Sequence, residues 1–396
     1  MSSRPCPRPS ASSEVSAVPP PPLRGRIEVG GWQRNRREDE DNRSCWVNPP
    51  SRPSPARGEG EFRNLKRDMR HYTRMAAGSL RDIGEQGLLR RIQARLGRRR
   101  GAVLLGPGDD AAALRVPRGK VLVVSQDDLV EGAHFERRWA DPARLARRLM
   151  AINLSDLAAM GDVRPLGCTV SSGLPPGLPG RWFDAFLRGL ERAAAAFGLP
   201  VAGGNLARSE KLFFSLAVFG AADRSRLVLR SGAKPGDLLA GVGPLGEAAA
   251  GLDLLMARRP VPAWGRALVR SFWEPVPQFP AGRILSDFAT SMMDDSDGLA
   301  RSARTLAEAS GLRLEVNLDE APVSPALRRW CASRGKSLRE HQLRGGEDYG
   351  LVFTVPPGRW AALKRRLPGA YLLGRAVAGR PRTVPGHSSF EHFGSK

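Results

Sequence analysis

The stretch Val121-Leu122-Val123-Val124-Ser125-Gln126-Asp127-Asp128 decides much of the fold, because an apolar run is followed at once by two acids. The aliphatic residues of Val121–Ser125 predict a buried β-strand. We expect the strand to end there and to deliver Asp127 and Asp128 at its carboxyl end, where α/β proteins place ligands. Carboxylates in so apolar a setting repel each other unless a cation lies between them.

Four further acidic segments place Asp or Glu among small residues. They are Gly106-Pro107-Gly108-Asp109-Asp110-Ala111, Asn153-Leu154-Ser155-Asp156, Met293-Asp294-Asp295-Ser296-Asp297-Gly298 and Gly345-Gly346-Glu347-Asp348-Tyr349. Each has an ordinary alternative: an Asp-rich turn, an ion pair of Asp156 with an arginine, a helix cap, or a plain turn. Because five such segments occur in one chain, we interpret them together as a site for Mg²⁺, which prefers oxygen ligands and usually binds with phosphates. Phosphoryl transfer is therefore the first functional hypothesis.

The bulk composition is that of a folded but strongly basic protein. The chain has 396 residues, 41% of them hydrophobic, and its 62 Lys and Arg against 40 Asp and Glu give a formal net charge of +22. This length allows two domains. The basic residues are spread along the chain without a nucleic-acid-binding motif, so we expect steering of anionic substrates rather than a nucleic-acid partner.

Cysteine usage and hydropathy indicate a cytoplasmic protein without membrane association. Cys6, Cys45, Cys168 and Cys331 show neither metal-ligand spacing nor the density of a disulfide framework, which suits a reducing compartment. No apolar run approaches the roughly 18 residues of a membrane span, and the N-terminus lacks the apolar core of a secretory signal.

Residues 1–74 differ in composition from the rest of the chain. Pro, Ser and Arg dominate, as in Ser51-Arg52-Pro53-Ser54-Pro55, and periodic apolar residues are absent. Such a segment buries too little surface to offset its chain entropy, so we expect it to be disordered. Helical apolar spacing begins after Met75, in a helix starting near Ser79, and we expect Met75 to be the true start of the protein.

The remaining chain mixes strand and helix patterns, which predicts an α/β or α+β fold. The expected strands are Val121–Ser125, Leu166–Ser172, Leu212–Phe219, Leu238–Val242, Leu312–Val316, Tyr349–Val355 and Tyr371–Val377. The expected helices, in addition to the first, cover residues 142–160, 181–197, 246–257, 299–310 and 358–367. A turn-rich segment after Ala222 suggests an N-terminal domain of residues 75–223 and a C-terminal domain of residues 224–396.

Taken in order, these motifs resemble the thiamine-monophosphate kinase family, in the superfamily that also holds aminoimidazole ribonucleotide synthetase and selenophosphate synthetase. The resemblance covers about residues 79–393 and is most specific at Asn153–Gly161, Arg230–Asp237, Asp294–Leu299 and Gly345–Tyr349. It implies a two-domain aminoimidazole ribonucleotide synthetase-like fold, with an N-terminal α/β domain that binds ATP and Mg²⁺ and forms a homodimer, and a C-terminal α/β domain. It also implies transfer of the ATP γ-phosphoryl group to thiamine monophosphate, giving thiamine diphosphate and ADP.

The resemblance also assigns roles to single residues. It implies several Mg²⁺ ions held by Asp110, Ser125, Gln126, Asp127, Asp156, Asn205, Asp294 and Asp297, of which Asp127 and Asp297 are the catalytic pair. It implies ATP contacts at Gly204, Asn205, Arg230 and Ser296, and contacts to the thiamine substrate at His134, Glu347 and Phe390. The chain departs from the family at Asn205, where Asp is usual, and at Gln126, where Thr is usual. An amide adds no negative charge, so we expect one metal ion to bind more weakly.

The chemistry agrees with these residues. The acceptor phosphate is already ionised at neutral pH, so no strong general base is required, and we expect direct in-line transfer without a phospho-enzyme. The phosphate loop of P-loop enzymes and the protein-kinase motifs are absent from the sequence. Two alternatives stay open: another ATP-dependent member of the superfamily, and a catalytically impaired metal- or RNA-binding descendant.

Overall fold

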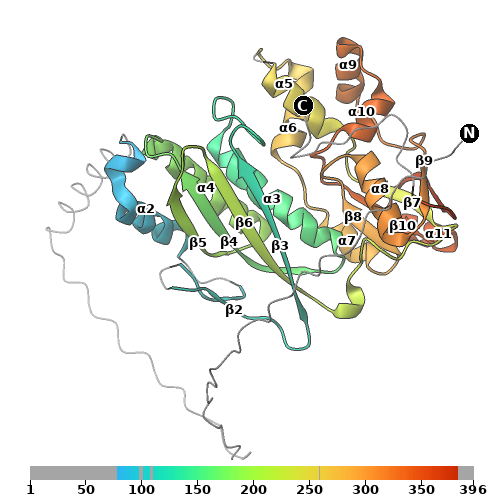
Figure 1. Cartoon of the computed structure of the whole chain (residues 1–396), viewed down its shortest axis with the longest axis horizontal. Coiled ribbons are helices and arrows are strands. Elements are labelled where there is room, and N and C mark those ends of the chain that lie inside the picture. The colour runs from blue at the N-terminus through green and yellow to red at the C-terminus, as the bar shows by residue number, and fades with distance from the viewer. Residues whose placement is uncertain (1–77, 98–100, 108–109, 258, 382–396) are drawn as a thin grey trace, which may run out of the picture. The chain divides into compact units, whose positions relative to one another are not determined.

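The computed structural model of the chain describes residues 78–97, 101–107, 110–257 and 259–381, which all belong to the unit Glu59–Lys396 (Figure 1). The segment 1–74, for which disorder was predicted, and Phe390 lie outside the described residues. The predicted α+β character is confirmed, since helices and mixed sheets alternate along the described chain. No helix among these residues is long and apolar enough to span a bilayer.

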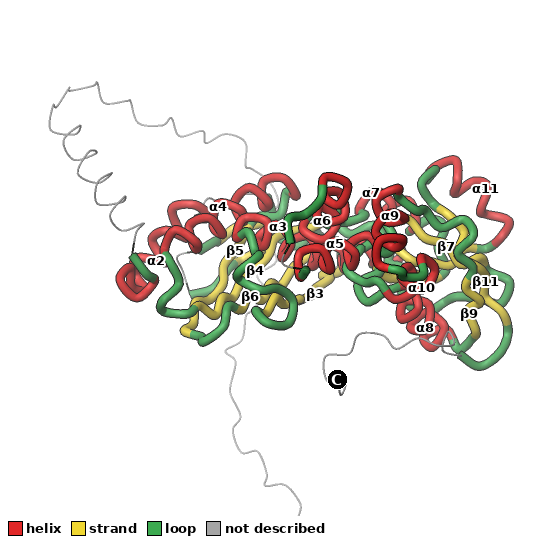
Figure 2. The backbone as a smooth tube through the Cα atoms, turned by 90° about the horizontal axis from the view of Figure 1, so that it is seen from above, coloured by secondary structure: helices red, strands yellow, loops and turns green. Residues whose placement is uncertain are grey.

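The first half of the described chain builds a four-stranded sheet in the order β3-β6-β4-β5. Its strands are β3 (Val121–Val130), β4 (Arg164–Leu174), β5 (Val201–Arg208) and β6 (Phe213–Ala222). β4 and β5 pair in parallel, and the other neighbours pair antiparallel. Helices α2 (Leu80–Leu96), α3 (Pro142–Ala159) and α4 (Gly180–Phe197) lie on one face of this sheet (Figure 2). A short hairpin of β1 (Val103–Leu105) and β2 (Ala113–Leu114) precedes it.

Helix α3 is the central helix of the structure. Its start is fixed by Pro142 and by the Asp141 side chain, which accepts a hydrogen bond from the N–H of Arg144. Leu145, Leu149 and most of its other residues are buried, because the helix packs against the sheet, α4 and α7. The polar side chains of Asn153 and Ser155 on α3 are therefore buried.

The second half builds a five-stranded sheet in the order β8-β10-β7-β11-β9, with every neighbouring pair antiparallel. Its strands are β7 (Leu238–Val242), β8 (Ser291–Asp294), β9 (Arg313–Val316), β10 (Leu351–Val355) and β11 (Tyr371–Val377). The helices of this half are α5 (Glu247–Met256), α6 (Arg266–Trp273), α7 (Phe279–Leu285), α8 (Leu299–Ser310), α9 (Pro325–Arg334), α10 (Leu338–Arg344) and α11 (Pro357–Arg366). Alternate strand residues face two apolar clusters: Met293 packs in the cluster with α8, and Met292 in the cluster with α7 and α11.

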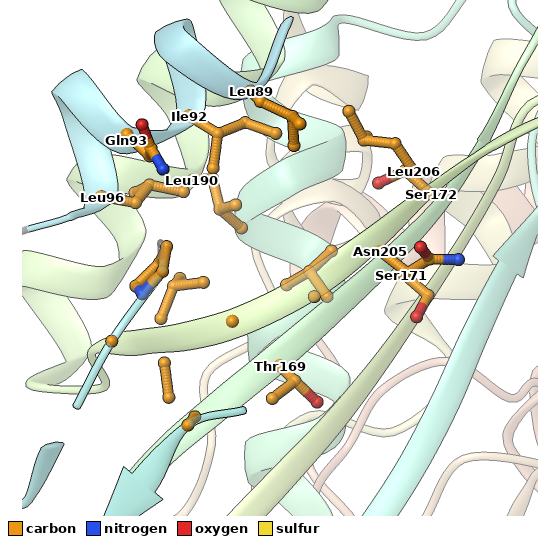
Figure 3. A pocket seen from close by; sticks show the side chains of 18 of the residues that line it. Leu89, Ile92, Gln93, Leu96, Thr169, Ser171, Ser172, Leu190, Asn205 and Leu206 are labelled. Carbon is orange, nitrogen blue, oxygen red and sulfur yellow. The ribbon is translucent and has the colours of Figure 1, made fainter. Parts of the chain in front are cut away.

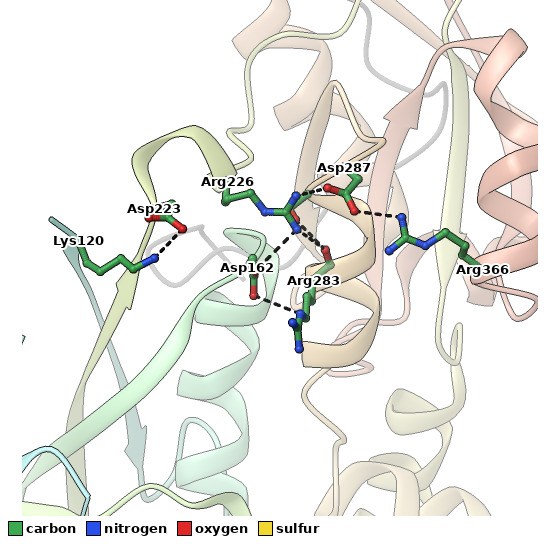
Figure 4. Close-up of polar contacts among 8 residues, drawn as sticks. Lys120, Asp162, Asp223, Arg226, Arg283, Asp287 and Arg366 are labelled. Atoms are coloured by element: carbon green, nitrogen blue, oxygen red, sulfur yellow. Dashed lines mark hydrogen bonds and ion pairs between the residues drawn. The ribbon is translucent and has the colours of Figure 1, made fainter. Parts of the chain in front are cut away.

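A network of ion pairs ties the connection between the two sheets to helices of the second half (Figure 4). Arg226 contacts Asp287 and lies 3.5 Å from Asp162, which follows α3. Asp287 also accepts a hydrogen bond from Arg366 of α11 at 3.0 Å. The predicted domain boundary at residues 223 and 224 falls just before this network and stays a prediction.

The sequence expectation for the end of β3 is wrong. The strand continues to Val130, because its ladder with β6 runs on to the pair Val130–Phe213. Asp127 and Asp128 therefore lie inside a strand and point to opposite faces of the sheet. Similarly, β10 begins at Leu351 rather than at Tyr349, because Glu347 and Tyr349 have positive φ angles of 70° and 54°, which a strand cannot accommodate.

Candidate active site

The strand β3 and the helix α3 together position the first group of acidic side chains. Ser125 and Asp127 share the face of β3 that packs on α3. The Ser125 hydroxyl donates to Oδ2 of Asp156 at 2.5 Å. The backbone N–H of Asp127 donates at 2.8 Å to Oδ1 of Asn153, a fully buried residue whose amide in turn donates to the Leu149 carbonyl. These contacts fix where both carboxylates lie.

The second sheet brings Asp294 to the same place. Asp294 ends β8, and its Oδ2 accepts a hydrogen bond at 2.8 Å from the hydroxyl of Ser155, the neighbour of Asp156 on α3. A cavity of about 430 Å³ is lined by Ser125, Asp156, Arg230 and Asp294. The structure thus joins residues that are up to 169 positions apart in the sequence, from Ser125 to Asp294, in one cavity.

The proximity of these carboxylates shifts their pKa values. Burial raises the pKa of Asp127 to about 7, and repulsion from Asp156, Asp128, Glu347 and Asp297 adds to the rise. Burial, with repulsion from Asp156, likewise raises the pKa of Asp294 to about 7. Burial also raises the pKa of Asp156, against the opposing effects of the Ser125 hydrogen bond and of Arg230. Neutral pH therefore places several negative charges in a low-dielectric region, where a cation would stabilise them.

Two loops of the second half, residues 295–298 and residues 345–350, are hydrogen-bonded to each other beside this cluster. The N–H of Glu347 donates to the Ser296 carbonyl at 2.7 Å, and the N–H of Tyr349 donates to the Asp295 carbonyl at 3.1 Å. Asp297, from the first loop, lies 3.4 Å from Arg301 and contributes to the raised pKa of Asp127. The loop pair therefore holds Asp297 and Glu347 near the carboxylates of the first sheet.

The donor set fits Mg²⁺ bound together with phosphates. No three Asp, Glu, His or Cys side chains in the described ranges are placed to hold a metal ion by themselves. Mg²⁺ does not require such a cage, since it usually takes one or two carboxylates and completes its octahedral shell with water and phosphate oxygens. The site offers only oxygen ligands, from Asp127, Asp156, Asp294 and the Ser125 hydroxyl, and it carries excess negative charge. Both properties suit this ion.

A second group of predicted residues lines a different cavity, of about 730 Å³, between α2, α4 and the strands β4 and β5 (Figure 3). It contains Asp110, Gly204 and Asn205, with apolar walls that include Leu89 and Ile92. Gly204 is required there because a Cβ atom would lie 1.9 Å from the Val170 carbonyl oxygen. Strand β5 is three strands away from β3, or about 14 Å at the usual spacing. Within one chain, this group is therefore separate from the Asp127 cluster.

The other predicted residues have these positions. Gln126 lies on the opposite face of β3 from Asp127, and its amide donates to the Ser215 hydroxyl at 2.8 Å. His134 follows β3, and its Nδ1 accepts a hydrogen bond from the N–H of Val130 at 3.0 Å. The structure therefore gathers Ser125, Asp127, Asp156, Asp294 and Asp297. It does not place Asp110, Gln126 or Asn205 with them, and their assignment as metal ligands stays a prediction.

Sequence reasoning missed three supporting side chains on α3. Asn153 holds the backbone of Asp127, Ser155 holds Asp294, and Arg148 contacts Glu347. The signal was available in the helical spacing: Arg148, Ser155 and Asp156 stand at i, i+7 and i+8, which places them on one side of a helix predicted to be buried. Polar residues on a buried stripe need partners, and here the partners come from other segments.

Comparison with known proteins places the chain in a family. A family model described as AIR synthase related protein, N-terminal domain, matches residues 108–222. The thiamine-monophosphate kinase of Aquifex aeolicus (strain VF5) is 34% identical over 282 residues, which is 71% of this chain and 89% of the relative. That of Salmonella typhimurium is 38% identical over 275 residues, 69% of this chain and 83% of the relative. The solved structure of AaThiL complexed with AMPPCP and TMP superposes with a TM-score of 0.64 at 29% identity, covering 79% of this chain and 98% of that one. With such identity over most of the length of its relatives, the chain belongs to the thiamine-monophosphate kinase family.

Proposed function

We propose that the chain transfers the γ-phosphoryl group of ATP directly to the phosphate of thiamine monophosphate, giving thiamine diphosphate and ADP. The observation that carries this proposal is the convergence of Ser125, Asp156 and Asp294 from three different elements on one cavity, with Asp127 close enough to Asp156 for their charges to interact. Family membership supports the reaction, and the structural relative complexed with AMPPCP and TMP supports the pair of substrates.

The main obstacle to this reaction is repulsion between two anions, the triphosphate and the acceptor phosphate. Mg²⁺ held by Asp127, Asp156, Asp294 and Ser125 would neutralise phosphate charge and align the donor with the acceptor. The protein contributes the fixed orientation of these ligands through Asn153 and Ser155. Arg230, which lines the same cavity, supplies a permanent positive charge for a phosphate.

The thiamine end of the acceptor is assigned to Glu347. Its carboxylate is close enough to Asp127 to raise the pKa of that group, so a substrate that contacts Glu347 can present its phosphate to the acidic cavity. The thiazolium ring carries a positive charge, which a partly exposed carboxylate attracts. Asp297, whose charge also raises the pKa of Asp127, completes the predicted catalytic pair with Asp127.

We further propose a homodimer and a cytoplasmic location. The edge strand β3 exposes Leu122 and Val124, 50% and 55% respectively, on the sheet face opposite α3. A second copy of the same sheet would cover these side chains. The described cysteines, Cys168 and Cys331, are buried and unpaired with each other, as suits a reducing compartment where ATP is abundant.

The test is an assay of the purified protein with ATP, Mg²⁺ and thiamine monophosphate. We expect thiamine diphosphate and ADP in equal amounts by chromatography, and no product from the Asp297→Asn variant although it stays folded by circular dichroism. Full activity of that variant would refute the role of Asp297. Retention on RNA at high salt with no ATP turnover would instead support the binding-protein alternative.

A further inference from the structure

Arg148 is a buried charge that reaches from α3 to the second half of the chain. Its side chain is only 2% exposed. Its Nη1 donates to the carbonyl of Phe272, its Nη2 donates to Oε2 of Glu347, and its guanidinium carbon lies 4.0 Å from the centre of the Phe272 ring. These contacts hold the guanidinium in one orientation and leave Glu347 as its ionic partner.

Tyr349 acts on the same oxygen of Glu347. Its hydroxyl donates to Oε2 at 2.8 Å, and its ring centre lies 5.8 Å from the guanidinium carbon of Arg148. No described side chain donates to Oε1, while the Glu347 side chain remains 28% exposed. One carboxylate oxygen is therefore held by two donors, and the other remains available to a ligand.

The backbone of this segment is also strained. Glu347 and Tyr349 have φ angles of 70° and 54°, which are costly for residues other than glycine. The hydrogen bonds of their N–H groups to Ser296 and Asp295 keep them there. Strain of this kind persists where the surroundings fix a side chain for a task.

A contribution to folding stability does not by itself explain why a charged Arg148 is buried here. Its Nε has no hydrogen-bond acceptor among the described residues, so the buried guanidinium is incompletely satisfied. Desolvating an ion pair costs several kcal/mol, roughly as much as the pair regains, and apolar replacements of such pairs are often neutral or stabilising. We therefore interpret Arg148 as a residue that orients Glu347.

We propose that Arg148 and Tyr349 are positioning residues that aim Glu347 at the thiamine moiety of the substrate. This inference rests on the proposed function, in which Glu347 contacts that moiety. Because Ser155 and Asp156 lie two turns further along the same helix, α3 sets the distance between the thiamine contact and the acidic cavity. The acceptor is thereby held at both ends by one rigid element.

The first experiment compares Arg148→Met with Arg91→Met in the full-length protein. Arg91 forms the other well-buried ion pair of this half, with Asp184 at 2.8 Å, and serves as the matched control. We expect Arg148→Met to raise KM for thiamine monophosphate about 10- to 100-fold, the usual effect of losing a hydrogen bond to a charged group. KM for ATP should change less than about twofold, and Arg91→Met should leave both KM values unchanged. Both variants should lower Tm, because each leaves a carboxylate without its buried partner.

Two milder variants distinguish a loss of affinity from a folding defect. Arg148→Lys keeps the charge and should recover part of the lost affinity, and Tyr349→Phe removes only the hydroxyl and should raise the same KM. Equal increases of both KM values in Arg148→Lys and Tyr349→Phe would contradict a role confined to Glu347.

The decisive measurement is a double-mutant cycle with Glu347→Gln. If Arg148 acts through Glu347, Arg148→Met should change the affinity for thiamine monophosphate less than about twofold once Glu347 is Gln. Equal effects in both backgrounds would overturn the proposal. Calorimetric titration of thiamine monophosphate into the wild type and the variants measures the Kd values for the same cycle without turnover. A wild type that binds this ligand but forms no thiamine diphosphate would refute the proposed function alone, whereas absence of binding would refute both.

Discussion

The hydroxyl of Ser155 donates a hydrogen bond to Oδ2 of Asp294 at 2.8 Å and so joins α3 to strand β8 of the second sheet. Both side chains are buried, 0% and 4% exposed. The next residue of α3, Asp156, accepts a hydrogen bond from Ser125 of the first sheet. Two consecutive residues of one helix therefore bind partners from both sheets, and the acidic cavity depends on this arrangement.

We predict that Ser155→Ala lowers kinase activity by about tenfold at a fixed Mg²⁺ concentration. The substitution removes a hydrogen bond to a charged group, typically worth about 1.5–3 kcal/mol, and leaves Asp294 free to rotate. Raising Mg²⁺ should restore part of the rate. Ser333→Ala, which removes a hydrogen bond on α9, is the control and should leave the Mg²⁺ dependence unchanged. An unchanged Mg²⁺ titration for Ser155→Ala would show that Asp294 needs no such support.

Substitution of the two neighbouring acids of β3, Asp127 and Asp128, should have very different effects on kcat. Asp127 faces α3 and the acidic cluster, whereas Asp128 is exposed on the opposite face. Asp127→Asn removes a proposed Mg²⁺ ligand. It should reduce kcat by more than about 10- to 100-fold, which is the usual cost of losing a side chain that only supports a ligand. Asp128→Asn changes the same charge one residue away and should keep kcat within about threefold of the wild type. Similar losses from both variants would contradict the observed strand orientation as the basis of function.

Binding of Mg²⁺ should strengthen as the pH rises from 6 to 8. The pKa values of Asp127 and Asp294 are about 7 in the folded protein, above the value of about 4 in an unfolded chain. The folded state thus binds more protons, so these groups stabilise the metal-free protein below about pH 4 and this contribution is lost as pH rises through 7. Mg²⁺ competes with those protons, and its stabilising effect on Tm should be larger at pH 8 than at pH 6.

Scanning calorimetry with and without Mg²⁺ and an ATP analogue measures this dependence. Asp294→Asn is the informative variant, because it removes one of the two titrating groups. It should flatten the pH dependence of the Mg²⁺-induced rise in Tm. A rise in Tm that is independent of pH in the wild type would contradict the prediction.

Much of the fold could be predicted because its elements have clear local signals. Leu238–Val242, Leu299–Ser310 and Tyr371–Val377 were predicted with the bounds that the structure shows. Helix α2 starts after Ser79, as expected from a capping residue. In contrast, β5 was missed because Gly203 and Gly204 interrupt its apolar pattern, and β8 because it has four residues.

The site was harder to predict, since its geometry depends on contacts between distant segments. The clustering of Asp127, Asp156 and Asp294 could be expected, because small or apolar residues flank the acidic segment that contains each of them in the sequence. The end of β3 could not, because strand length depends on pairing with β6, which a single sequence window does not reveal. The family resemblance likewise placed Gln126 and Asn205 with Asp127 among the Mg²⁺ ligands, although the strand alternation and the strand order separate them within one chain.

The ion-pair network at Arg226 should stabilise the protein at neutral pH and not in acid. Hydrogen bonds from Arg226 and Arg366 hold the pKa of Asp287 below its usual value. A lowered pKa gives stability that is present above about pH 4 and is lost as pH falls through the folded value. Because the side chains of Arg226 and Asp287 are roughly one-third exposed and that of Arg366 about half, solvent weakens these pairs, and Asp287→Asn should cost about 1 kcal/mol at pH 7. Urea unfolding at pH 7 and pH 3 should show that the cost is smaller at the lower pH.

Asn205 provides the last prediction, since it stands where the family usually has an acid. It is exposed at the cavity between α2 and β5, so a carboxylate can be introduced there without burying a charge. If this position ligates Mg²⁺ when ATP is bound, Asn205→Asp should lower the Mg²⁺ concentration that gives half-maximal activity, because a negative ligand binds the ion more tightly than an amide. Asn317→Asp adds the same charge on the other half of the chain and should have no effect. Identical Mg²⁺ titrations for Asn205→Asp and the wild type would remove Asn205 from the metal site, and would agree with its separation from Asp127 in the structure.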